Sequence, residues 1–243
     1  MAGNWKMYKT PSETRAFFEK FTSAVAGATE RDIVICPPFV SLPAAVEATV
    51  KTNIEIGGQN LFWEVKDGAY TGEISGRMLK AAGARWAIVG HSERRQHFGE
   101  TDETVYKRTC AALEAGLRPI VCVGELLQER ESGHTNWVLE KQFTHGISKL
   151  SEEQFAKIAI AYEPVWAIGT GKTATPEIAA DAHRFIREQA QTKYGSGRVR
   201  ILYGGSVKPD NIKGLMAQEE IDGVLVGGSS LDPASFAAIV NYL

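Results

Sequence analysis

The sequence has few cysteines and no long apolar run. Its three cysteines, Cys36, Cys110 and Cys122, are odd in number and form no CxxC pair, which argues against a disulfide framework and fits a reducing compartment. Its apolar runs are far shorter than the ~20 residues that cross a bilayer. The first ten residues, MAGNWKMYKT, lack the apolar segment of a signal peptide. We therefore expect a cytoplasmic protein with no membrane partner.

A strong charge of either sign is also missing. The 27 lysines and arginines nearly balance the 29 aspartates and glutamates, for a net charge of −2, so no general attraction to nucleic acid is predicted. A small anionic substrate would need a local binding site. The five histidines show no spacing typical of a zinc site, so we expect no metal; they are His91, His97, His134, His145 and His183.

Short apolar runs of strand length alternate with helical stretches along the whole chain. The runs are nearly continuous rather than alternating, which is typical of parallel strands buried on both faces. Several helical stretches begin with a capping residue followed by proline, as at Thr10-Pro11, Thr175-Pro176 and Asp232-Pro233. The predicted helices include 12–27, 102–116, 177–193 and 234–242, and the predicted strands are 2–7, 31–38, 53–59, 85–91, 118–125, 157–164, 198–205 and 222–228.

Eight strand–helix units in 243 residues fit the size of a closed (β/α)₈ barrel. An open, doubly wound sheet usually carries a glycine-rich fingerprint after its first strand, whereas Met7-Tyr8-Lys9-Thr10 follows here. No low-complexity linker or compositional break divides the chain. We expect one α/β domain, residues 1–243.

In such a barrel, function lies at the carboxyl ends of the strands. Lys6, His91 and Glu163 end three predicted strands, and glycine turns at 203–206 and 227–230 end two others. Taken singly, each charge is most often a solvated surface residue, and each glycine pair a plain turn. Together they indicate a site in which backbone N–H groups of the turns bind a phosphate.

The segment AYEPVWAIGTGKTA, residues 161–174, contains a sequence similar to a nucleotide-binding loop. That motif needs glycine at position 166, where this chain has Trp, so the sequence does not predict a nucleotide-binding loop here. A carboxylate, a neutral imidazole and an ammonium group suit proton abstraction next to a carbonyl, with 164–174 as a cover that excludes water. No serine or cysteine nucleophile with a nearby base is apparent, so acyl transfer is poorly supported.

Five motifs, in this order and at these spacings, closely resemble the triosephosphate isomerase family: AGNWKM, VGHSERR, AYEPVWAIGTGKTA, YGGSV and GVLVGGSSL. The resemblance covers essentially the whole chain. It implies a TIM barrel that interconverts dihydroxyacetone phosphate and D-glyceraldehyde 3-phosphate through an enediol(ate), in glycolysis and gluconeogenesis. It also implies that no cofactor or metal is used.

The same resemblance implies roles for individual residues. Glu163 matches the general base, and His91 the neutral electrophile whose charged form is disfavoured by a helix beginning at Ser92. Lys6 balances substrate charge, Asn4 hydrogen-bonds near it, and Glu93 supports the site. The implied substrate-binding residues are Asn4, Trp5, Lys6, Gly169, Ser206, Gly227 and Gly228.

The family pattern further implies a homodimer, in which loop 66–75 brings Thr71 near the partner's site. Tyr8 and Ser229 depart from the residues most common in the family. Tyr8 lies in the region that meets the partner's loop in the family pattern, and Ser229 lies in a glycine turn. Two other functions stay open: a different phosphate-binding barrel, such as a phosphoribosyl isomerase, and a barrel that binds ligands without catalysis. An assay with glyceraldehyde 3-phosphate separates all three.

Overall fold

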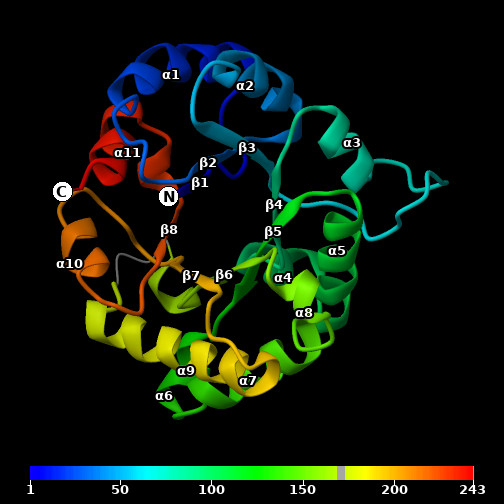
Figure 1. Cartoon of the computed structure of the whole chain (residues 1–243), viewed down its shortest axis with the longest axis vertical. Helices are drawn as coiled ribbons and strands as arrows, with labels where there is room; N and C mark the ends of the chain where they lie inside the picture. The colour runs from blue at the N-terminus through cyan, green and yellow to red at the C-terminus, as the bar shows by residue number, and fades with distance from the viewer. Residues whose placement is uncertain (169–172, 243) are drawn as a thin grey trace.

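The computed structural model describes residues 1–168 and 173–242, and in them eight parallel strands close into a barrel in sequence order. Figure 1 shows the strands at the centre and helices around them. All the predicted strands are confirmed, each shorter than its apolar run. They are β1 (Ala2–Asn4), β2 (Ile33–Cys36), β3 (Ile54–Gly58), β4 (Trp86–Val89), β5 (Arg118–Val123), β6 (Ala159–Tyr162), β7 (Arg200–Tyr203) and β8 (Gly223–Val226).

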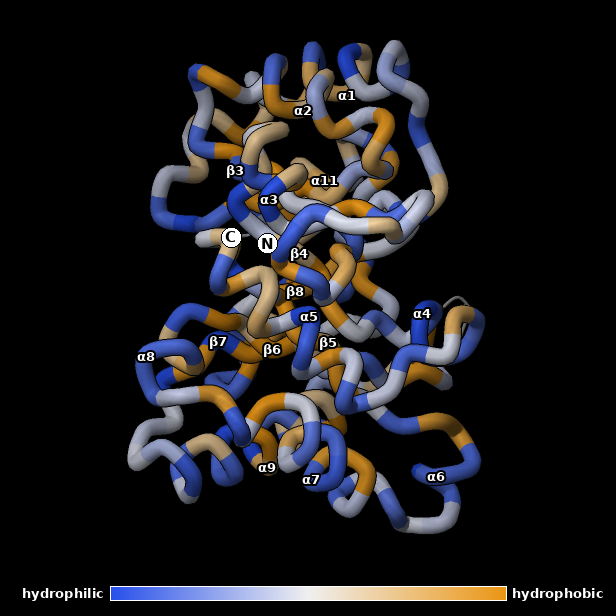
Figure 2. The backbone as a smooth tube through the Cα atoms, turned by 90° about the vertical axis from the view of Figure 1, so that its right-hand side faces the viewer, coloured by the Kyte–Doolittle hydropathy of each residue, from blue (hydrophilic) through white to orange (hydrophobic). Residues whose placement is uncertain are grey.

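The barrel closes where β1 pairs with β8, with Ala2 opposite Leu225 and Gly3 opposite Val226. Alternate strand residues face two separate apolar regions, because successive side chains point to opposite faces of a sheet. Val34 faces the barrel interior, whereas its neighbour Ile35 packs in the larger core under the helices. The expected burial of both strand faces is confirmed, and Figure 2 shows the apolar strands inside a more hydrophilic periphery.

The helices begin where the sequence places caps. Thr10 forms a complete capping box with Glu13, Thr175 accepts the N–H of Ile178, and Asp232 accepts the N–H of Ser235. The helices are α1 (Pro11–Ala24), α2 (Leu42–Thr49), α3 (Gly76–Ala81), α4 (Ser92–Phe98), α5 (Asp102–Glu114), α6 (Leu127–Glu131), α7 (Thr135–Gly146), α8 (Glu152–Phe155), α9 (Pro176–Tyr194), α10 (Ile212–Met216) and α11 (Pro233–Val240).

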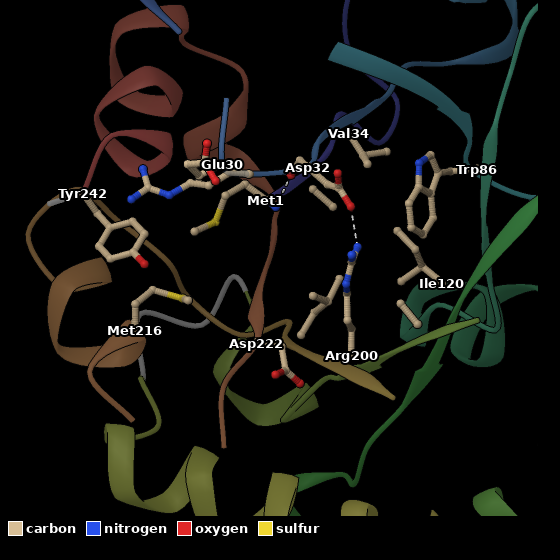
Figure 3. Close-up of a pocket in the computed structure, with 14 residues that line it drawn as sticks. Met1, Glu30, Asp32, Val34, Trp86, Ile120, Arg200, Met216, Asp222 and Tyr242 are labelled. Atoms are coloured by element: carbon tan, nitrogen blue, oxygen red, sulfur yellow. Dashed lines mark hydrogen bonds and ion pairs between the residues drawn. The ribbon is translucent and has the colours of Figure 1, made fainter. Parts of the chain in front are cut away.

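The two ends of the barrel differ in character. At the amino ends of the strands, a pocket of about 350 Å³ has apolar walls that include Trp86 and Ile120, and an Asp32–Arg200 ion pair (Figure 3). The carboxyl ends carry the residues that the sequence selects. Within the described part of the chain, no helix is both long and apolar enough to cross a membrane.

Candidate active site

A cavity of about 370 Å³ opens at the carboxyl ends of the strands. It brings together side chains and turns that lie far apart in the sequence, since strand ends of a parallel barrel meet at one rim. Its lining comprises Asn4, Lys6, His91, Glu163, Ile168, Gly204, Gly205, Ser206, Val207, Lys208, Leu225, Gly227, Gly228 and Ser229.

Glu163 follows β6 directly and is only 2% exposed. Its Oε1 lies 2.9 Å from Nε2 of His91, and its Oε2 accepts the N–H of Ser92 at 2.8 Å. Burial alone would raise the pKa of this carboxyl group, but His91, the Ser92 N–H and Lys6 outweigh it, and the net shift is downward. Glu163 is therefore a carboxylate, the form that a base requires.

His91 is the N-cap residue of α4, and its Nδ1 accepts the N–H of Glu93 at 3.2 Å. A ring nitrogen that accepts a hydrogen bond carries no proton, so the proton of the neutral ring is on Nε2, facing Glu163. Burial disfavours the imidazolium form, but the facing Glu163 carboxylate outweighs burial and raises the pKa of His91. The direction of this shift is opposite to the expectation from the sequence that the charged form of His91 is disfavoured. A second proton would nevertheless cost the bond between Nδ1 and Glu93.

Lys6 has a φ of 50°, in the left-handed region that non-glycine residues rarely adopt. The Oδ1 of Asn4 accepts its N–H at 3.0 Å, and Gln59 donates to its carbonyl oxygen at 2.8 Å. These bonds hold a strained backbone that directs Nζ to Oε1 of Glu93, 2.6 Å away. The lysine charge is thus kept at the rim of the cavity, close to the Glu163–His91 pair.

The two glycine turns, which follow β7 and β8, form part of the cavity wall. A Cβ on Gly204 would lie 2.9 Å from Cγ of Glu163, so only glycine allows this turn so near the carboxylate. Ser229 joins the turns, because its hydroxyl donates to the carbonyl oxygen of Val207 at 2.7 Å. Ser206, Gly227 and Gly228 line the cavity. Gly169, also expected here, lies outside the described residues.

Trp5 differs from the other expected substrate-binding residues, because its side chain is fully buried away from the cavity. It packs edge-on against Phe17, with ring centroids 4.8 Å apart, and its indole N–H donates to the carbonyl oxygen of Ser230 at 3.0 Å. Trp5 lies directly after β1, between Asn4 and Lys6, so its bond to Ser230 connects this segment to the turn after β8. Its contact with a substrate would have to be through the backbone.

Two polar residues near strand ends are not among the residues predicted from the sequence. Gln59 comes directly after β3, and Glu125 lies two residues after the end of β5. Glu125 is fully buried and accepts hydrogen bonds from the Tyr162 hydroxyl at 3.0 Å and the Trp166 indole at 2.9 Å. The rule that selected Lys6 and Glu163, a polar residue at the end of an apolar run, would have selected both.

Among the described residues, no group of three or more histidine, cysteine, aspartate or glutamate side chains could hold a metal ion. The segment between β3 and α3 extends from the barrel wall in Figure 1, and its Val65 and Tyr70 side chains are 42% and 44% exposed. Met7 is 93% exposed and Tyr8 is 59% exposed, and Thr71 is also exposed.

A buried carboxylate–imidazole pair, a lysine and glycine turns at the rim of a (β/α)₈ barrel define an enzyme class: barrels that move protons on small phosphate esters. The triosephosphate isomerase family model matches residues 1–243. The chain is 67% identical to triosephosphate isomerase of Solibacter usitatus, over all of this chain and 98% of that protein. The relative from Moorella thermoacetica is 54% identical, over all of this chain and 97% of that protein.

The solved structure of triosephosphate isomerase from Bartonella henselae superposes with a TM-score of 0.90 at 38% identity, over all of this chain and 97% of that one. The chain belongs to the triosephosphate isomerase family, whose members interconvert dihydroxyacetone phosphate and glyceraldehyde 3-phosphate in glycolysis.

Proposed function

We propose that this chain performs that interconversion with Glu163 as the base and His91 as the electrophile. The observation that carries the proposal is the 2.9 Å contact between Glu163 and His91 Nε2, buried beside the two glycine turns. A substrate whose phosphate rests on the turns at Ser206, Gly227 and Gly228 would have its carbons beside these two side chains, and its carbonyl group would replace Glu163 as the partner of His91.

In the forward direction, Glu163 removes a proton from C1 of dihydroxyacetone phosphate. The electron pair forms the C1–C2 double bond, and negative charge develops on the C2 oxygen. His91 donates from Nε2 to this oxygen, and the Lys6 ammonium group stabilises its charge. Glu163 then returns the proton to C2, while the proton of the C1 hydroxyl group moves to the C2 oxygen, which leaves the C1 aldehyde of glyceraldehyde 3-phosphate. Asn4 supports Lys6, and Glu93 orients both Lys6 and His91.

Replacement of the base tests this assignment. In Glu163→Gln we expect kcat to fall by at least ~10²- to 10⁴-fold, because an amide cannot accept the proton. Affinity for glycerol 3-phosphate, which has the phosphate but no carbonyl group, should stay close to that of the unmodified protein.

A matched control is Glu153→Gln, an exposed glutamate of α8 that pairs with Lys157. This variant should keep full turnover of glyceraldehyde 3-phosphate. Near-normal activity of Glu163→Gln would exclude Glu163 as the base. If the unmodified protein fails to turn over either triose phosphate, the proposed reaction itself is wrong.

The proposal extends to the setting of the site. Residues 1–243 would act as one domain in a cytoplasmic homodimer, with loop 66–75 and Thr71 against the partner. The cover over the site would be 164–174, of which 169–172 lie outside the described residues. Support for the dimer comes from exposed apolar side chains such as Met7 and Tyr8, which are costly to leave in water.

A further inference from the structure

Gln142, on α7, binds both backbone polar groups of Gly124, the residue that follows β5. Its Oε1 accepts the N–H of Gly124 at 2.7 Å, and its Nε2 donates to the carbonyl oxygen of Gly124 at 3.0 Å. Two bonds from one planar amide group fix both the position and the orientation of this backbone unit. Gln142 is half-buried and does not line the substrate cavity.

Gly124 in turn packs directly on the backbone of Glu163. A Cβ added to Gly124 would lie 1.8 Å from the carbonyl oxygen of Glu163 and 2.6 Å from its carbonyl carbon. The same two segments are also joined by a hydrogen bond, because the N–H of Glu163 donates to the carbonyl oxygen of Val123 at 2.7 Å. The two backbone segments touch directly, with no side chain between them, so a movement of Gly124 toward Glu163 displaces the backbone of Glu163.

The next residue, Glu125, supports the segment on both sides of Glu163. Its carbonyl oxygen accepts the N–H of Val165 at 3.1 Å, and its carboxylate binds the side chains of Tyr162 and Trp166. Residues 123–125 therefore form a platform under 162–166. Gln142 is the side chain that fixes the middle of this platform to the helix layer.

We propose that Gln142 is a positioning residue for the base Glu163, acting through the backbone of Gly124; this inference rests on the proposed isomerase function. A misplacement of ~1 Å at a reacting group can cost ~10²-fold in rate. The platform contacts the base and the start of the predicted cover, whereas the glycine turns follow β7 and β8. Loss of Gln142 therefore weakens the chemical step and spares phosphate binding.

Gln142→Met tests the inference, because methionine has similar length but neither hydrogen-bonding group. We expect kcat to fall by ~10- to 100-fold. The KM for glyceraldehyde 3-phosphate and the inhibition constant of glycerol 3-phosphate should change less than about twofold. Gln142→Glu keeps the acceptor that faces the N–H of Gly124 and should recover part of the lost kcat.

The matched control is Gln191→Met on α9. Gln191 also accepts a glycine N–H, that of Gly197, at 2.9 Å, but this contact lies away from the candidate site. Both methionine variants should lose stability, and only Gln142→Met should lose kcat. A folded Gln142→Met variant with unchanged kcat, or an equal loss of kcat in Gln191→Met, would overturn the inference.

Hydrogen exchange gives a readout that does not depend on turnover. The amides of Glu163 and Val165 should exchange faster in Gln142→Met than in Gln191→Met, because the platform that accepts their bonds has lost its support. If the unmodified protein has no isomerase activity, the proposed function fails, and exchange alone decides the positioning role. Unchanged exchange at both amides would reject that role.

Discussion

The carboxylate of Glu163 is held by partners that a substrate must replace. His91 and the Ser92 N–H both stabilise its charged form and lower its pKa, which makes it a weaker base while they remain bound. A substrate carbonyl that accepts the hydrogen bond from Nε2 of His91 removes one of these partners from Glu163. Substrate entry would then return basicity to Glu163 at the moment when it is needed, which couples binding to the proton transfer.

Ser229 offers a separate test of the phosphate turns. In Ser229→Ala the bond from its hydroxyl to Val207 is lost, and the turns after β7 and β8 are no longer joined there. A net loss of ~0.5–1.5 kcal/mol for one hydrogen bond corresponds to a KM roughly 2- to 12-fold higher, with kcat nearly unchanged. Steady-state kinetics with glyceraldehyde 3-phosphate measure both constants.

A suitable control is Ser148→Ala, which removes a similar hydroxyl-to-carbonyl bond, to Thr144, on the exposed surface. Its KM should equal that of the unmodified protein. A rise in KM for this control, or a fall in kcat without a rise in KM for Ser229→Ala, would contradict the assigned role of Ser229.

The residues that the sequence predicted share one property: they follow apolar strands, and a parallel barrel brings such positions together without further information. Lys6, His91 and Glu163 needed only that topology. Gln142 could not be found this way, because it lies inside a helix and its contact with Gly124 depends on how α7 packs on β5. The left-handed backbone of Lys6 likewise depends on Gln59, which is 53 residues away.

Among the secondary-structure elements, α9 carries a titratable group inside the core. His183 is fully buried, with Nδ1 3.1 Å from the carbonyl oxygen of Glu220 and its ring edge-on to Tyr162. A carbonyl oxygen only accepts, so Nδ1 carries the proton of a neutral ring. Burial lowers the pKa of His183 to about 4, from an ordinary value of 6.5.

This depressed pKa predicts acid sensitivity. Between pH 6.5 and about 4 the unfolded chain binds a proton at His183 that the folded chain does not, so stability is full above pH 6.5 and falls as the pH drops. At pH 4.5 the loss from this one residue is roughly 2–3 kcal/mol relative to pH 7. Free energies of unfolding from urea titrations at both pH values measure it.

His183→Asn is the matching variant, because asparagine can donate to Glu220 but does not titrate in this range. Its stability at pH 7 should be lower, and its further loss of stability between pH 7 and 4.5 should be smaller by roughly 2–3 kcal/mol. Titration of all other groups cancels in this comparison. Equal losses for the two proteins would mean that His183 is not buried as a neutral ring.

At the level of the whole molecule, the capped helices and buried strands were predictable because local signals agree with the barrel. Thr10 caps α1, and the nearly continuous apolar strands have both faces covered. The helices between these signals were less apparent, since α3, α6, α8 and α10 have only four to six residues each and show little periodicity. Their position is determined by packing on the barrel.

Two exposed apolar side chains bear on assembly. Met7 is 93% exposed, and Phe98, at the end of α4, is 66% exposed. Both lie close in sequence to catalytic candidates, Met7 next to Lys6 and Phe98 on the helix capped by His91. A partner that covers them would therefore also support the loops that carry these two residues.

We accordingly expect sedimentation to give about twice the 26.5 kDa mass of one chain. In Met7→Glu, an unpaired charge would enter the covered surface, at a cost of about 3 kcal/mol or more, which weakens association by ~10²-fold. The expected product is a folded monomer with reduced kcat, because the backbone at Lys6 loses its support.

The control is Val50→Glu. Val50 directly follows α2, is 74% exposed and lines a different pocket together with the β3 residues Ile54 to Ile56. This control should sediment and react as the unmodified protein does. A monomeric unmodified protein with full activity would show that the site is complete in one chain.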